Sequence, residues 1–154
     1  MKRILAVILL GLSLAMTACS SESSKTENEN NFPPTMKGTI EVNGQQYDIA
    51  TGNYRWERKQ GMETQVIVTD AASPYQIAEN FEAIPISQRE PIHINIEDKP
   101  TITVYLWDEK GRQKEVSVNN NQMEAPESAG KYVYEVLAEW SNGEVSYTFV
   151  VEME

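Results

Sequence analysis

The chain has 154 residues, of which 13 are basic and 23 are acidic, so its net charge is −10 at neutral pH. A surface of this charge is repelled by nucleic acid, and the composition therefore argues against a nucleic-acid partner. The single cysteine excludes a disulfide within the chain, so the fold must depend on a packed core.

The first 18 residues have the pattern of a secretory signal peptide. Lys2 and Arg3 precede an apolar run over residues 4–14, which is the charged-then-apolar order that directs export. This run is shorter than the roughly 20 residues that a membrane-spanning helix needs. We therefore expect residues 1–18 to be a cleaved signal peptide.

The only cysteine, Cys19, directly follows Met16, Thr17 and Ala18. These four residues resemble the lipobox of bacterial lipoproteins. The resemblance implies cleavage before Cys19, a diacylglyceryl group on its sulfur, and anchoring at the extracytoplasmic face of the cell membrane. Two acyl chains give durable membrane binding, whereas one binds only marginally. The alternative is an ordinary secretory signal that is cut near Ala18 and leaves a free thiol.

Residues 19–34 are expected to form the lipidated cysteine and a disordered tether. Residues 20–31 contain no apolar side chain. Such a segment cannot bury enough surface to offset the entropy lost on ordering. A flexible tether of this kind would hold a domain clear of the lipid headgroups.

The rest of the chain, residues 35–154, has the length of one domain. Apolar and polar residues alternate in short segments separated by glycine, proline, asparagine and aspartate, which predicts antiparallel strands. Asn43-Gly44 and Ser141-Asn142-Gly143 indicate hairpin turns, and Gly61 lies in a third. The predicted strands are residues 38–42, 45–50, 53–57, 64–70, 92–96, 101–107, 114–118, 132–140 and 144–152. The fold class expected is an all-β sandwich of about eight or nine strands.

Residues 126–140, with Pro126, Gly130 and Tyr132, resemble the end of an immunoglobulin-like domain. The resemblance implies an immunoglobulin-like antiparallel β-sandwich in which the Tyr132 hydroxyl bonds to upstream backbone. It also implies that Tyr134, Val136 and Ala138 face the core. Taken over its length, the pattern is similar to that of small Gram-positive lipoproteins without an assigned activity, so the resemblance implies a fold and no chemistry.

Side chains suited to catalysis or metal binding are few. His93 alternates with three isoleucines and is expected to point outward from its strand. Glu97-Asp98 and Asp108-Glu109 are expected at opposite ends of one strand, too far apart for a shared role. Either pair could hold a calcium ion together with loop carbonyls, but neither has the spacing of an EF-hand, and turn residues are the preferred interpretation. We therefore expect no catalytic residues, no metal and no cofactor.

Residues 70–81 do not alternate and predict a single helical turn near residues 74–80. Tyr75 lies in this turn and Phe81 follows it. They could line a groove or cap the core, and capping is the preferred interpretation.

The candidate partner-binding residues are Tyr54, Arg55, Trp56, Arg58 and Trp140. Aromatic and basic side chains of this kind are common at protein contacts. The alternative interpretation is an ordinary strand end with a charged hairpin tip.

The function expected is a non-catalytic binding or accessory module of the cell envelope, anchored to the membrane through Cys19 and acting on an envelope protein. A second hypothesis comes from residues 51–57, which are similar to the tyrosine- and tryptophan-containing loop of chagasin-type cysteine-protease inhibitors. This resemblance implies inhibition of a protease or another envelope enzyme through a loop around Tyr54 and Trp56.

Overall fold

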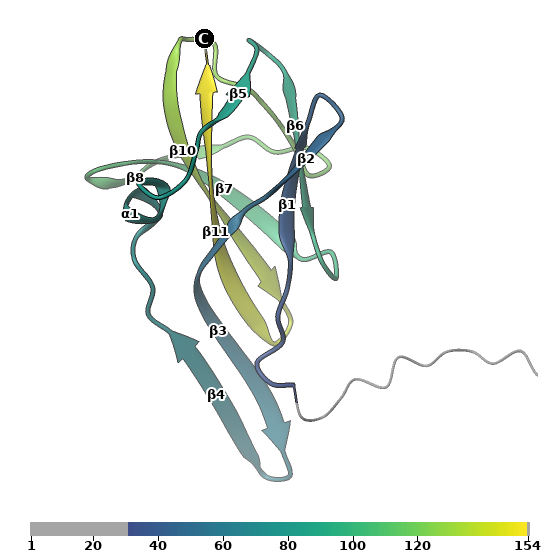
Figure 1. Ribbon diagram of the computed structural model, residues 1–154. Helices are drawn as coiled ribbons and strands as arrows, with labels where there is room; N and C mark the ends of the chain where they lie inside the picture. Colours follow the sequence, from purple (N-terminus) through teal and green to yellow (C-terminus); the bar gives the residue numbers. More distant parts are fainter. Residues whose placement is uncertain (1–30, 154) are drawn as a thin grey trace, which may run out of the picture. The chain divides into compact units, whose positions relative to one another are not determined.

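The computed structural model describes residues 31–153 (Figure 1). A compact unit begins at Phe32. It is built almost entirely of antiparallel strands in two sheets, which confirms the predicted all-β sandwich. The predicted signal peptide, Cys19 and residues 20–30 of the predicted tether lie outside the described residues.

The smaller sheet has four strands in the order β2-β1-β6-β9. Their bounds are β1 Gly38–Val42, β2 Gln45–Asp48, β6 Pro91–Ile96 and β9 Gln122–Glu124. The predicted turn at Asn43-Gly44 joins β1 to β2, and both residues have positive φ angles, 53° and 73°. This is the conformation that two-residue hairpins favour.

The larger sheet has the order β4-β3-β11-β10-β7-β8, and β5 pairs in parallel with the end of β11. The bounds are β3 Ala50–Gln60, β4 Glu63–Thr69, β5 Ile84–Ile86, β7 Thr101–Asp108, β8 Gly111–Val116, β10 Gly130–Trp140 and β11 Gly143–Met153. The nine predicted strands are all present. The sequence did not predict β5 and β9, because three residues are too few to show an alternating pattern.

The main core lies between the two sheets. The smaller sheet contributes Ile40, Val42, Ile92, Ile94, Ile96 and Met123. The larger sheet contributes Trp56, Val104, Tyr134, Val136, Ala138, Val145, Tyr147, Phe149 and Val151. The expected inward direction of alternate residues in β6 and β10 is therefore confirmed.

The Tyr132 hydroxyl donates a hydrogen bond to the carbonyl of Ser128 at 2.9 Å. This is the upstream backbone contact expected of a corner tyrosine. The finer prediction of an immunoglobulin-like domain stays a prediction.

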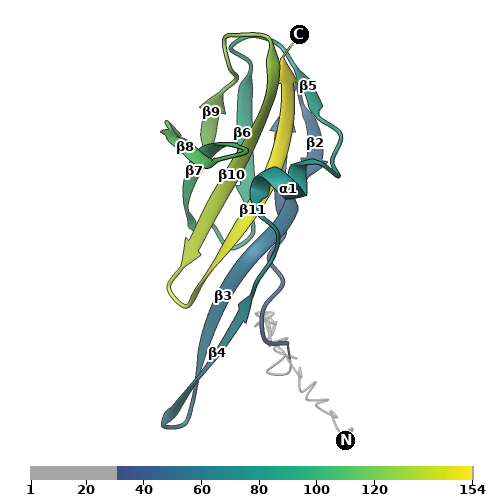
Figure 2. The ribbon, with the colours of Figure 1, turned by 90° about the vertical axis from the view of Figure 1, so that its left-hand side faces the viewer.

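A short helix, α1 (Pro74–Ala78), covers the outer face of the larger sheet (Figure 2). Ser73 caps the helix, and Pro74 and Ala78 are its buried residues. Ala78 packs with Val133 and Val150 in a second, smaller core. Tyr75 and Phe81 are exposed, so the expectation that they cap the core is wrong. Pro74 and Ala78, and not the aromatic residues, are the side chains that α1 buries.

Residues 32–37, which we call the N-terminal segment, contact the rest of the fold before β1 begins. Arg58 places its guanidinium over the Phe32 ring, 4.6 Å from the centroid. The Tyr147 hydroxyl donates to the Met36 carbonyl at 3.0 Å. The N–H of Glu97 donates to the carbonyl of Lys37 at 3.0 Å. These contacts tie the start of the compact unit to both sheets.

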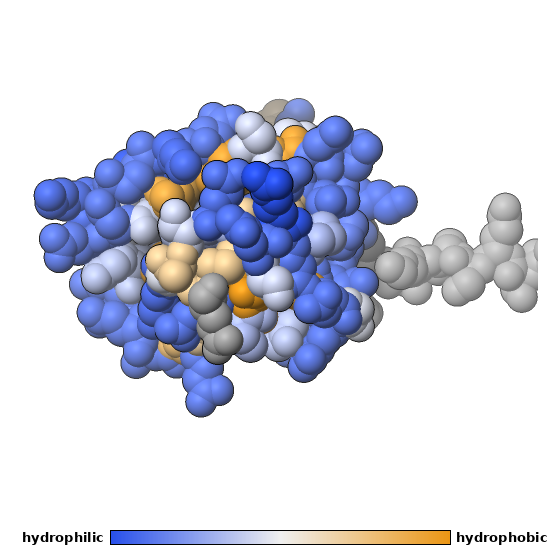
Figure 3. Space-filling view, turned by 90° about the horizontal axis from the view of Figure 1, so that it is seen from above, coloured by the Kyte–Doolittle hydropathy of each residue, from blue (hydrophilic) through white to orange (hydrophobic). Residues whose placement is uncertain are grey.

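The β3–β4 hairpin extends beyond its neighbours in the sheet (Figures 1 and 2). β11 pairs with β3 only as far as Trp56, and Glu57 still bonds to Asn142 of the adjoining turn, so residues 58–60 pair with β4 alone. Gly61, with φ 63°, and Met62 form the two-residue turn at its tip. Figure 3 looks onto the opposite end of the compact unit, where hydrophilic residues cover most of the surface.

Gly143 leaves the space that the Trp56 ring occupies. The two residues face each other across β11 and β3, and Trp140 packs on the same ring at a centroid distance of 5.1 Å. A Cβ on residue 143 would lie 2.1 Å from Trp56 Cε3 and 2.7 Å from the Arg55 carbonyl oxygen. Any side chain at this position must therefore displace the tryptophan or the backbone.

We predict that Gly143→Ala lowers the free energy of unfolding by about 1–3 kcal/mol, the cost of overpacking a filled core. Urea unfolding followed by tryptophan fluorescence measures the change. Ser141→Ala, an exposed substitution in the same turn, is the matched control and should leave the midpoint unchanged. Equal midpoints for the two variants would contradict the close contact.

Candidate functional site

The structure divides the predicted partner-binding residues between the two faces of the larger sheet. Trp56 is 1% exposed and lies in the core against Trp140, which is half-buried. The interpretation of Trp56 as a surface contact is wrong, because strand alternation turns its side chain inward. Residues 51–57, for which the chagasin-type resemblance implies a loop, lie within β3.

The basic members of the predicted set also have partners within the fold. Arg55 points to the outer face and forms an ion pair with Glu57. Arg58 donates to Gln65 at 2.8 Å and lies over Phe32. Tyr54 is half-buried. The five predicted residues therefore do not form one exposed patch.

The other candidate chemistry is dispersed. His93 is exposed on β6, between buried isoleucines, as predicted. Glu97 and Asp98 follow β6, whereas Asp108 and Glu109 lie at the far end of β7, which confirms their separation. Within residues 31–153 no group of three or more histidine, cysteine or acidic side chains could hold a metal ion.

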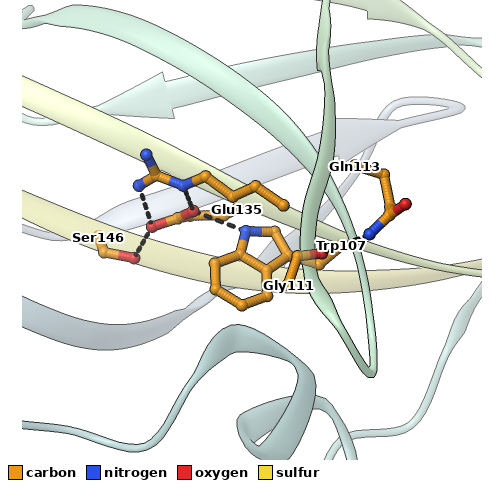
Figure 4. Close-up of polar contacts among 6 residues, drawn as sticks. Trp107, Gly111, Gln113, Glu135 and Ser146 are labelled. Carbon is orange, nitrogen blue, oxygen red and sulfur yellow. Dashed lines mark hydrogen bonds and ion pairs between the residues drawn. The ribbon is translucent and has the colours of Figure 1, made fainter.

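A buried charge cluster that the sequence analysis missed lies on the outer face of the larger sheet (Figure 4). The Glu135 carboxylate on β10 accepts two hydrogen bonds from Arg112 of β8, at 2.7 and 3.0 Å. It also accepts from Trp107 Nε1 at 2.6 Å and from the Ser146 hydroxyl at 2.9 Å. The Arg112 guanidinium lies over the Tyr105 ring, 4.1 Å from the centroid.

The charge of Glu135 is balanced within this cluster. Burial raises the pKa of the Glu135 carboxyl, but hydrogen bonds from Arg112, Ser146 and Trp107 outweigh burial and hold the pKa below its ordinary value. The hydrogen bond to Glu135 raises the pKa of Arg112. Because both carboxylate oxygens already accept two hydrogen bonds each, Glu135 is poorly placed to act as a general base or a ligand. We interpret the cluster as structural.

Alternation alone does not reveal this cluster. Glu135 is out of phase with the core-facing Tyr134 and Val136, so the alternating pattern places it on a solvent-facing side of β10. The structure buries it there, because α1 and the side chains of β7 and β8 cover that face. Its partners come from three other strands, and the sequence does not show which strands are neighbours.

The clearest exposed feature is the outer strand of the protruding hairpin. On β4, Val66 is 45% exposed and Val68 is 65% exposed, and Met62 at the tip is fully exposed. We call the surface formed by Met62, Val66 and Val68 the hairpin edge. β4 has a neighbour on one side only, so the hairpin edge combines apolar side chains with unpaired backbone groups.

Within residues 31–153, the other four strands at the sheet edges are protected. β2 has four residues, and β5 and β9 have three each, so none of them offers a long backbone ladder. β8 carries Arg112, Lys114 and Glu115 among its six residues. β4 has seven residues with no proline and no charge after Glu63. Short or charged edges resist pairing with another chain, whereas long uncharged edges invite it.

A comparison with known proteins finds no matching family model, no matching curated protein and no matching solved structure. Among the described residues, no helix is both long and apolar enough to cross a membrane.

We predict that Glu135→Gln lowers the free energy of unfolding at neutral pH by about 1–3 kcal/mol, because buried donors lose a charged acceptor. Water can reach Arg112, whose side chain is 43% exposed, and this limits the cost. Glu115→Gln on β8 is the matched control, because it also removes one carboxylate, but from an exposed side chain.

Glu135→Gln should also change how the stability of the fold depends on pH. A carboxyl whose pKa is lowered by folding stabilises the protein at pH values above its ordinary pKa of 4.5, and this contribution is lost as the pH falls through the lower folded value. Urea midpoints across the acid range should therefore fall less steeply for Glu135→Gln than for the wild type. Parallel curves would show that Glu135 is not held in its charged form.

Proposed function

We propose that this chain is an extracytoplasmic lipoprotein, anchored to the cell membrane through Cys19, whose domain is a binding or accessory module without catalysis. The observation that carries the binding role is the hairpin edge. Apolar side chains on an edge strand, in a chain with a net charge of −10, are typical of contact surfaces.

The polar groups of the described residues support binding rather than turnover. Catalysis needs a nucleophile or base and a group that stabilises developing charge, assembled in one cleft. His93 is exposed on the smaller sheet, the carboxylate pairs lie apart, and Glu135 is saturated with hydrogen bonds. None of these groups is brought together with another in a catalytic arrangement.

The proposed anchor is supported by the sequence of the first 19 residues. Removal of residues 1–18 takes away Lys2 and Arg3 and leaves 11 basic and 23 acidic residues, a net charge of −12. Such a chain has little electrostatic attraction for anionic lipid, so membrane binding would depend on the lipid at Cys19. The protein that this module binds would lie in the same compartment, the cell envelope.

We do not extend the proposal to the inhibitor hypothesis. An inhibitory loop has to insert its aromatic side chains into the active site of an enzyme. Here Tyr54 and Trp56 lie on a paired strand, and Trp56 is in the core.

The anchor is tested by expressing the full chain in a bacterial host and measuring its intact mass and its partition between membrane and soluble fractions. We expect the wild type to lose residues 1–18, to gain a diacylglyceryl group and to sediment with membranes. Cys19→Ala should remain unmodified and leave the membrane fraction, whereas Ser20→Ala, the neighbouring control, should behave as the wild type. A wild-type chain that is unmodified and does not sediment with membranes would contradict the proposed anchor.

A further inference from the structure

We propose that the hairpin edge binds a second copy of this chain, with two β4 strands pairing antiparallel to join the larger sheets of both copies. This inference deepens the proposed function, because it assigns a partner to the binding surface on which that function rests. It does not depend on the lipid anchor.

The backbone of β4 is oriented for this pairing. The N–H of Glu57 donates to the Asn142 carbonyl at 2.8 Å, on the side of β3 that faces β11. Glu57 is opposite Val66 in the β3–β4 register. Because backbone groups alternate in direction along an antiparallel strand, those of Val66 point away from β3, as do those of Thr64 and Val68. Three successive outward residues can therefore exchange hydrogen bonds with another strand.

One register makes the strand complementary to itself. With Ile67 on the two-fold axis, Val66 of each copy lies opposite Val68 of the other, so that four valines meet on the outer face. Asp70 then lies opposite Thr64, and no carboxylate faces another. With Val66 on the axis, Val68 would face Thr64, and the valine contacts would be fewer. Apolar β-branched pairs across a ladder are stabilising, and like charges opposite each other are not.

The charge around the hairpin edge also permits the contact. Association of two copies with a net charge of −10 each is opposed by their overall repulsion. On the outer face, however, the residues opposite Val66 and Val68 are Glu57 and Arg55, which form an ion pair with each other. The local surface is therefore close to neutral.

The association is measured by sedimentation velocity on the full chain carrying Cys19→Ala, over about a hundred-fold range of concentration, because mass action makes dimer formation concentration-dependent. We expect a monomer–dimer equilibrium. Val68→Lys should weaken it by about tenfold or more, since it places a charge against a valine at two symmetric positions. Gln113→Lys adds the same charge on the edge strand β8 and should leave the equilibrium unchanged.

Hydrogen exchange gives a second reading that does not depend on a variant. The outward amides of Val66 and Val68 should exchange rapidly at low concentration and become protected as dimer forms. The amides of Gln65 and Ile67 point toward β3 and should be protected at every concentration. Val68 is 65% exposed in the single chain, so Val68→Lys should retain the folded spectrum.

A thiol at the proposed axis tests the register. Residues directly opposite at a non-hydrogen-bonded position have Cα atoms about 4.5 Å apart, within the range of about 4.4–6.8 Å that a disulfide spans. In the Cys19→Ala chain, Ile67→Cys should therefore form a covalent dimer on mild oxidation, and Thr64→Cys should not.

A chain that stays monomeric at all concentrations, or a dimer that Val68→Lys leaves intact, would overturn the inference. Cross-linking at residue 64 but not at residue 67 would overturn the register. A monomeric chain that is still lipidated and membrane-bound would leave the proposed function standing with another partner. An unlipidated chain that dimerises would refute the anchor alone.

Discussion

The pairing of β10 with β11 is the contact on which the rest of the sandwich depends. The two strands pair without a break from Gly130 and Met153 to Trp140 and Gly143. Their central residues are buried on both faces, so the strand pair must supply apolar surface to the smaller sheet on one side and to α1 on the other. β3 and β7 extend the sheet on either side of this pair.

Burial on both faces explains the polar groups in the centre of the fold. Ser146, Thr148 and Glu135 lie on the outer face of the central pair, where a single short helix is too small to cover the sheet. The Glu135–Arg112 ion pair fills part of the remaining area and connects β10 to β8. Such a buried pair contributes little net stability compared with an apolar replacement, because desolvation offsets the attraction. Its hydrogen bonds join side chains from four strands, β7, β8, β10 and β11.

Local sequence patterns predicted most of the fold but little of the candidate site. Alternation located nine strands, and the Asn43-Gly44 and Gly143 turns joined the expected pairs, because these signals depend on neighbouring residues. The exposure of Trp56 depends on which face of β3 meets the smaller sheet, and the environment of Glu135 depends on strand order. Both are tertiary properties. β4 was predicted as a strand, but its place at a sheet edge, which makes Val66 and Val68 a candidate site, comes only from the topology.

The fastening of the N-terminal segment has a mechanical consequence. Phe32 lies against β3 and Met36 is bonded to Tyr147 in β11, both ahead of the first residue of β1. Tension on a chain held from its N-terminal side would meet these attachments before it reached the β1 ladder. The force would act first on β3 and β11 of the larger sheet. The smaller sheet would bear force only after the contacts of Phe32 and Met36 had broken.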